Sequence, residues 1–186
     1  MWPQRSASIL FLFALVFFTA RVAATAQNIS NQVPSRCPIT TPPDPPYVPP
    51  PPPYRSEHAN DRFWFGTDKL WINLPVNGMW SIGHYSPTES AFRQKLLWYR
   101  RGYNVREEPK PGLIVTGKRL DGPAAPLDVD GPHGAWGSGH PEESFMTVGL
   151  NIPTTGCWEI TGQYGVDKLS FVVWVEDRTR DRAAGR

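Results

Sequence analysis

The side chains best suited to metal or acid–base chemistry are concentrated between residues 128 and 143. They are carboxylates and imidazoles: Asp128, Asp130, His133, His140, Glu142 and Glu143. Such ligands bind calcium or zinc when they converge. However, the stretch 128–131 lacks the third ligand position and the distal glutamate of a helix-loop-helix calcium site, and the histidine spacing suits neither a helix nor alternate strand positions. We therefore expect a polar, glycine-rich loop with no metal or cofactor.

The residue order gives little support to nucleophilic catalysis. There is no Gly-x-Ser-x-Gly turn, and the closeness of Ser138 to His140 is uninformative because folds, not sequence neighbours, assemble catalytic triads. The paired carboxylates at 107–108 and 142–143 are adjacent, so a strand would point them to opposite faces. The sequence predicts a protein that is not an enzyme.

Aromatic side chains are the third candidate for a functional site. Seven tryptophans follow the N-terminal leader: Trp64, Trp71, Trp80, Trp98, Trp136, Trp158 and Trp174. Exposed Trp and Tyr rings can stack on sugars or anchor a protein partner. The alternative is that these rings pack beneath loops or beneath a crossing N-terminal segment. We predict that Trp98, Tyr99 and Arg100, together with Arg101, form the main contact patch, with Trp136 in its glycine-rich loop as the second.

The first 26 residues have the pattern of an export signal. Arg5 is followed by the unbroken apolar run 9–20, and Ala24-Thr25-Ala26 provides a small-x-small cleavage site. An uncleaved anchor is the alternative, but a bilayer span needs about 20 residues. We expect cleavage after Ala26, no membrane span afterwards, and a protein that is secreted, periplasmic or associated with the cell envelope.

Export makes the two cysteines interpretable, because disulfides persist in oxidising compartments. Cys37 and Cys157 are predicted to form a disulfide; free thiols or a lipidated Cys37 are the alternatives. The bridge would join positions 120 residues apart (157 − 37). In the chain-entropy model a loop of that length contributes about 4–5 kcal/mol of stability.

The charge balance argues against nucleic acid as a partner. The chain has 19 Lys and Arg against 17 Asp and Glu, and residues 1–26 hold two of the basic residues and none of the acidic ones. The exported part therefore has 17 of each. It also lacks the cluster of basic and aromatic residues typical of nucleic-acid binding.

Composition divides the exported chain into three parts. Residues 27–60 include ten prolines between Pro38 and Pro53, which excludes regular pairing in a sheet and predicts a disordered, extended tether. Residues 61–176 should form the folded domain. Residues 177–186 are charged or small and should form a flexible tail.

Apolar residues in the domain recur at every second position, the period of a strand. The alternating sets are 70/72/74, 113/115, 146/148/150/152 and 169/171/173/175. Asn77-Gly78 predicts a hairpin turn between residues 70–74 and 79–82. The segment 86–100 is ambiguous; we expect a helical turn near 87–93 and extended chain after it. An antiparallel immunoglobulin-like β-sandwich of about 100 residues accounts for this pattern.

The final hairpin, at about residues 155–176, is the most informative segment. Trp158 and Ile160 should face the core opposite Phe171 and Val173, which directs Cys157 outward. A bridge to Cys37 would then pin the N-terminal segment across the sandwich and cover a strand edge.

The chain resembles a group of secreted bacterial proteins that have no assigned activity. The matching segments are Cys37-Pro38-Ile39-Thr40; Leu70-Trp71; Lys95 with Trp98 and Arg100; 117–127; 152–162; and Leu169-Ser170-Phe171-Val172. They span most of residues 37–176, with departures at 41–60 and 86–94. The resemblance implies the same two cysteines and the same terminal hairpin.

These observations predict a non-enzymatic extracytoplasmic module with a binding or structural role at the bacterial cell envelope. Its expected partner is a protein or a cell-wall glycan. The rival interpretations are a carbohydrate-binding accessory domain, a metal-dependent enzyme, and a proteinase inhibitor that acts through the segment 121–143.

Overall fold

The computed structural model describes residues 33–51, 54, 58–83, 90–137 and 140–178, and the side chains of His140 and Pro141 are not described. The predicted leader (1–26), positions 87–89 of the predicted helical turn near 87–93, and positions 179–186 of the predicted tail lie outside the described residues. A compact unit begins at Val33.

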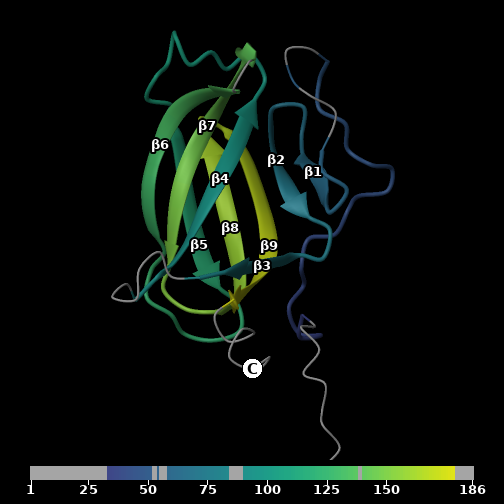
Figure 1. Cartoon of the computed structure of the whole chain (residues 1–186), viewed down its shortest axis with the longest axis vertical. Coiled ribbons are helices and arrows are strands. Elements are labelled where there is room, and N and C mark those ends of the chain that lie inside the picture. The colour runs from purple at the N-terminus through teal and green to yellow at the C-terminus, as the bar shows by residue number, and fades with distance from the viewer. Residues whose placement is uncertain (1–32, 52–53, 55–57, 84–89, 138–139, 179–186) are drawn as a thin grey trace, which may run out of the picture. The chain divides into compact units, whose positions relative to one another are not determined.

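Within these described ranges, nine strands in two sheets form the sandwich (Figure 1). The five-stranded sheet has the order β1-β2-β4-β7-β6, with the bounds Arg62–Gly66, Leu70–Pro75, Phe92–Arg100, His140–Ile152 and Asp128–Gly137. The four-stranded sheet has the order β3-β9-β8-β5, with the bounds Met79–Ile82, Asp167–Asp177, Gly156–Tyr164 and Leu113–Arg119. The predicted all-β sandwich is confirmed.

The alternating apolar sets meet between the two sheets and form the core. All four side chains of the set 146/148/150/152 are fully buried, and those of 169/171/173/175 are nearly so. Trp158 pairs with Val173 and Ile160 with Phe171, which is the predicted register of the terminal hairpin. The two-residue period therefore predicted correctly which side chains face the core, because one face of each strand is buried away from water.

The predicted hairpin through Asn77-Gly78 is wrong. The turn forms, with Gly78 at a φ of 65° and its amide bonded to the Pro75 carbonyl at 3.0 Å. However, β3 does not return along β2; it crosses to the other sheet and runs parallel to β9. A turn signal specifies local backbone geometry and does not specify which sheet the next strand joins.

Residues 92–93 belong to β4 and are therefore extended, whereas the prediction placed a helical turn on them. The expected extended chain after residue 93 is confirmed. Phe92 and Leu96 are buried from this strand, because seven residue pairs with β7 fix its register. Pairing over such a length outweighs the local helix-start signal.

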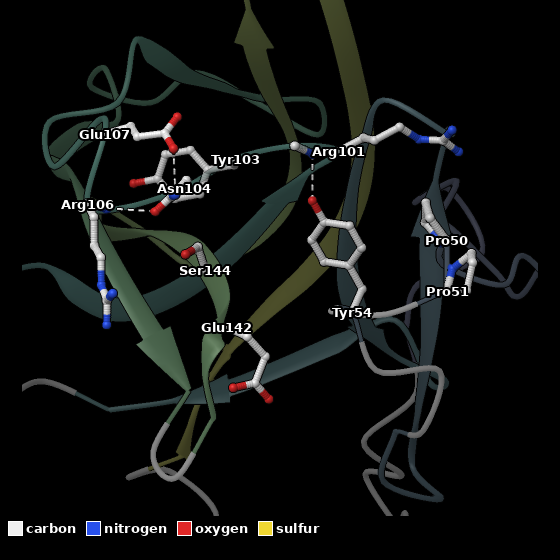
Figure 2. Close-up of a pocket in the computed structure, with 11 residues that line it drawn as sticks. Pro50, Pro51, Tyr54, Arg101, Tyr103, Asn104, Arg106, Glu107, Glu142 and Ser144 are labelled. Carbon is white, nitrogen blue, oxygen red and sulfur yellow. Dashed lines mark hydrogen bonds between the residues drawn. The ribbon is translucent and has the colours of Figure 1, made fainter.

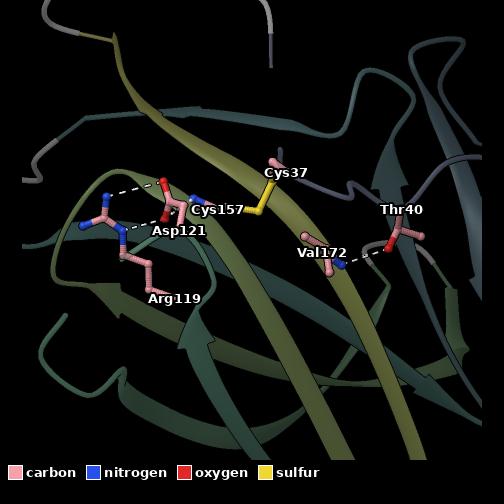
Figure 3. Close-up of a disulfide and its surroundings, with 6 residues drawn as sticks. All are labelled: Cys37, Thr40, Arg119, Asp121, Cys157 and Val172. Atoms are coloured by element: carbon pink, nitrogen blue, oxygen red, sulfur yellow. Dashed lines mark hydrogen bonds and ion pairs between the residues drawn. A yellow bond between two sulfur atoms is a disulfide. The ribbon is translucent and has the colours of Figure 1, made fainter. Parts of the chain in front are cut away.

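The disulfide between Cys37 and Cys157 is present, and their Cα atoms are 5.5 Å apart (Figure 3). Three residues further on, Thr40 bonds to β9 twice: its amide donates to the Val172 carbonyl at 2.9 Å, and its hydroxyl accepts from the Val172 amide at 2.8 Å. The N-terminal segment is thus pinned across the sandwich, where it covers part of the β9 edge as expected. We call residues 33–51 together with Tyr54 the strap.

The strap continues onto the outer face of the five-stranded sheet. The Tyr47 hydroxyl donates to the Thr67 carbonyl at 2.6 Å, and the Tyr54 ring packs edge-on against Trp71 at 4.8 Å. A second apolar cluster forms there, separate from the core: Tyr54, Trp64, Trp71 and Tyr99, with Tyr47 and Phe145 beside them. We call it the aromatic cluster. Trp71 is completely buried in this cluster. This agrees with the alternative interpretation, in which the tryptophan rings pack beneath a crossing N-terminal segment.

The disulfide should supply a large part of the domain's stability. Cys37→Ser frees the strap at its first attachment, so we expect the free energy of unfolding to fall by about 3–5 kcal/mol. Chemical denaturation followed by tryptophan fluorescence measures this difference. The Cys37→Ser/Cys157→Ser double variant should match the single variant, and a loss below about 1 kcal/mol in both would contradict the assigned role.

Candidate functional site

The predicted contact patch at Trp98 and Tyr99 is wrong for both rings. Trp98 is fully buried in the core against Phe171, at 5.9 Å between ring centroids. Tyr99 points to the other face of β4, where it stacks with Trp71 in the aromatic cluster beside the strap. Neighbouring strand residues point in opposite directions. Here both directions are buried, so neither ring is available to a ligand.

The two arginines that follow have separate roles. The Arg100 guanidinium lies over the Tyr164 ring, 4.2 Å from its centroid, in a cation–π contact. Arg101 is exposed, and its Nε donates to the Asp68 carbonyl at 2.9 Å. Of the predicted patch, Arg101 is the residue that lines the cleft described next.

This cleft, of about 790 Å³, lies between the strap and the loop after β4 (Figure 2). Its lining comes from three parts of the chain: Pro50, Pro51 and Tyr54 of the strap; Arg101, Gly102, Tyr103, Asn104, Arg106 and Glu107 of the loop; and Glu142 and Ser144 of β7. We call it the strap cleft. Its size is in the range typical of small-molecule sites.

Trp136, the second predicted contact residue, is not among the residues that line this cleft. It is 57% exposed, and in the β6–β7 ladder it lies opposite Ser144, which does line the cleft. Side chains directly opposite one another in an antiparallel pair point to the same face about 5 Å apart. Trp136 is therefore one cross-strand pair away from the cleft wall and presents a large apolar surface to solvent.

The strap wall of the cleft is held firmly by Tyr54. Its hydroxyl donates to the Arg100 carbonyl and accepts from the Gly102 amide, each at 2.7 Å. Burial is the main cause that raises the pKa of this phenol. Tyr54 therefore joins the strap to the start of the loop and fixes the distance between two walls of the cleft.

The opposite wall is organised by hydrogen bonds within the loop. The Asn104 side chain donates to Glu107 Oε1 at 2.8 Å and accepts from the Arg106 amide at 3.0 Å. The Val105 amide donates to Ser144 Oγ at 3.2 Å, which attaches the loop to β7. The wall is thus built before any ligand arrives.

A tyrosine–carboxylate network anchors the same loop from below. The Tyr103 hydroxyl donates to the Glu108 carbonyl at 2.9 Å, and the Tyr164 hydroxyl donates to the Glu108 carboxylate. The Gly112 amide donates to the same carboxylate at 2.9 Å. Burial, followed by Glu108 and Tyr164, raises the pKa of Tyr103 to about 12. The network positions the loop, and Tyr103 is its one member that also lines the cleft.

The polar segment 128–143 adopts a different structure from the expected loop. Residues 128–137 form β6, so Asp128, Asp130 and His133 are spread along a strand. Asp128 accepts from Asn151, and Asp130 lies 3.6 Å from the His133 imidazole. Within the described part of the chain, no three Asp, Glu, His or Cys side chains are grouped so that they could hold a metal ion.

Comparison of the chain with protein-family models, curated proteins and solved structures gave no match. Over the described residues, no helix is both long enough and apolar enough to cross a bilayer.

Sequence reasoning singled out Trp136, whose contact role stays a prediction, and it missed the strap cleft. The lining residues lie up to 94 positions apart (144 − 50) and carry no shared motif. The only available signal was the polar pair Asn104 and Glu107 directly after β4, at the spacing of a hydrogen-bonded turn.

Alkaline pH should weaken the fold through the buried phenols. Tyr103 and Tyr47 both have pKa values raised to about 12, with burial as the largest cause. Their unfolded pKa is about 10, so the unfolded chain loses these protons first. The free energy of unfolding should therefore fall as pH rises from about 10 to about 12, as denaturant midpoints would show. In Tyr103→Phe the fall should be shallower; an unchanged slope would contradict the assignment.

Proposed function

We propose that this protein is an exported, non-enzymatic binding module that acts at the bacterial cell envelope through the strap cleft and Trp136. The observation that carries the proposal is a preformed polar cleft whose lining residue Ser144 is the cross-strand partner of the exposed Trp136. The proposal concerns a binding site, because the cleft contains positioned hydrogen-bonding groups and no nucleophile with an adjacent base among its described residues.

Export is supported by two independent features. The first is the leader pattern of residues 1–26, with its cleavage site after Ala26. The second is the disulfide between Cys37 and Cys157, which persists in oxidising compartments. Cys37 lies only eleven residues after the proposed cleavage site (37 − 26). The bridge thus ties the region that follows the proposed cleavage site to the folded domain.

The chemistry of the cleft favours a glycan as the ligand. Sugars are bound by an aromatic face together with planar polar side chains that donate and accept hydrogen bonds. Trp136 supplies the face, and Asn104, Glu107 and Ser144 supply polar atoms at the wall. Pro50 and Pro51 add an apolar surface to the strap wall of the cleft, and their fixed backbone does not have to reorganise when a ligand binds. This is the carbohydrate-binding interpretation of the sequence, assigned to particular residues.

A protein partner at the envelope is the second candidate function. Arg101 and Arg106 flank the cleft, and Trp and Arg are the side chains most enriched at the energetic centres of protein interfaces. The two candidates differ in what should saturate the site: a small glycan fragment in the first case, and only a macromolecule in the second.

Glycan binding can be measured by quenching of tryptophan fluorescence with soluble cell-wall glycan fragments and with plain hexose oligomers. We expect saturable quenching by one class, and a loss of affinity of about tenfold or more in Trp136→Ala, because a stacked ring typically contributes over 1 kcal/mol. Ser144→Ala should weaken binding less, as it removes one polar atom.

Ile114→Ala is the matched control. Ile114 is also exposed, at 63%, but it lies on β5 of the other sheet. Its replacement should leave affinity unchanged. No saturable binding of any glycan, with Trp136→Ala indistinguishable from the parent, would reject the glycan site and leave the protein-partner candidate.

A further inference from the structure

The connection between β5 and β6 passes from the four-stranded sheet to the five-stranded sheet as an extended segment. Residues 123–127 contain neither a turn nor a bend and lead directly into β6. The central side chains are all exposed: Pro123, Ala124, Ala125 and Pro126. We call residues 122–126 the exposed loop. An extended segment of this kind is the form in which a polypeptide enters a groove on another protein.

The first end of the exposed loop is fixed beside the disulfide (Figure 3). The Leu120 amide donates to the Cys157 carbonyl at 2.7 Å, which extends the β5–β8 ladder by one position. The Asp121 carboxylate accepts from the Cys157 amide at 3.1 Å and from Arg119 Nε at 2.7 Å. The hydrogen bond from Arg119 is the main cause that lowers the pKa of Asp121, so this carboxylate stays ionised near neutral pH. This end is therefore tied to the strand that carries the disulfide.

The second end of the exposed loop is fixed by Leu127. Its side chain is partly buried and packs against the core. Its Cδ2 atom lies only 2.7 Å from the position that a Cβ atom at Gly117 would occupy, so the glycine of β5 leaves room for this side chain. Directly after Leu127, Asp128 begins β6 and pairs with Asn151 of β7. The loop is thus attached at both ends by contacts that do not involve its central residues.

Between these two attachments the backbone of the exposed loop is open. The amides and carbonyls of Ala124 and Ala125 have no hydrogen-bond partner among the described residues. The loop contains no charged side chain, so its recognition would depend on backbone pairing and on small apolar side chains. Pro123 and Pro126 restrict the backbone on either side of the two alanines, so the loop loses little conformational entropy when it binds.

The groove that fits such a loop is the active-site groove of an endopeptidase. A peptidase of this kind pairs with the backbone of an extended chain and takes one side chain into a specificity pocket, which in some enzymes admits only small side chains. Pro126 has no amide hydrogen, and its ring crowds the peptide bond that precedes it. We therefore assign Ala124–Ala125 as the bond that the loop presents, with the Ala124 side chain at the pocket.

We propose that the exposed loop enters the active-site groove of a serine endopeptidase with a small specificity pocket and inhibits that enzyme competitively. The two attachments keep the loop from being consumed. When the serine oxygen bonds to the Ala124 carbonyl carbon, the bond to Ala125 breaks and the serine proton passes to the Ala125 nitrogen. Both new ends stay in place, so the reverse reaction re-forms the peptide bond. The exposed loop shares no residue with the lining of the strap cleft, so either proposal can fail without the other.

The probe is pancreatic elastase, whose pocket takes small side chains, and trypsin is the comparison because its pocket requires a basic side chain. We expect the purified chain, with its disulfide intact, to inhibit peptide hydrolysis by elastase competitively and to leave trypsin unaffected. Ala124→Arg should reverse this specificity: inhibition of elastase should weaken about tenfold or more, and trypsin should become inhibited. The side chain of residue 124 is exposed, so the substitution should not disturb the fold.

Val166→Arg is the matched control. Val166 is 97% exposed between β8 and β9, so an arginine there adds the same charge outside the exposed loop and should not inhibit trypsin. Asp121→Asn weakens the first attachment, so elastase should cleave this variant several times faster, as mass spectrometry would show. The proposal is overturned by any of three results: no inhibition of elastase by the parent chain, rapid cleavage at Ala124–Ala125 with loss of inhibition, or inhibition of elastase that persists in Ala124→Arg.

Discussion

The cover that the strap places over the outer face of the five-stranded sheet is the constraint on which the rest of the structure depends. A sandwich buries one face of each sheet, yet this sheet carries Trp64, Trp71 and Tyr99 on its other face as well. The strap covers these outer-face rings with the side chain of Tyr54, whose hydroxyl is held by two hydrogen bonds. The disulfide at Cys37 keeps the strap in place, and its prolines lose little conformational entropy on docking.

The strap cleft follows from this cover. It exists because the strap ends against the loop after β4, with Tyr54 fixing the spacing between them. On the outer face of the same sheet, the β1–β2 hairpin separates from β4 after three residue pairs. The rings of Trp64 and Tyr99 line a cleft at that separation and also belong to the aromatic cluster beside the strap.

The sequence predicts which strand side chains face the core, because this depends only on the two-residue period. It does not predict contacts between segments that are far apart in the chain. The sets 146/148/150/152 and 169/171/173/175 were placed correctly because alternation alone decides which face is dry. Trp98 and Tyr99 were misplaced because the run 96–99 is apolar on both faces. Tyr99 is buried on the second face by rings from distant parts of the chain: Trp64, Trp71 and Phe145 contact it, and Tyr54 of the strap packs on Trp71. Asn77-Gly78 correctly predicted a turn, but a turn motif does not determine which sheet the following strand, β3, joins.

The treatment of strand edges shows how the chain limits unwanted pairing. The β9 edge receives Thr40 of the strap and then β3, and the outer strand β6 carries Pro132, which has no amide to offer. These edges are protected by features that the chain itself supplies. Between β2 and β4 the ladder stops after three residue pairs, and the Arg62 guanidinium donates to the Asn73 carbonyl just beyond that point. The side chains of Arg62, Lys95 and Glu143 all line the cleft there, so charges of both signs are present.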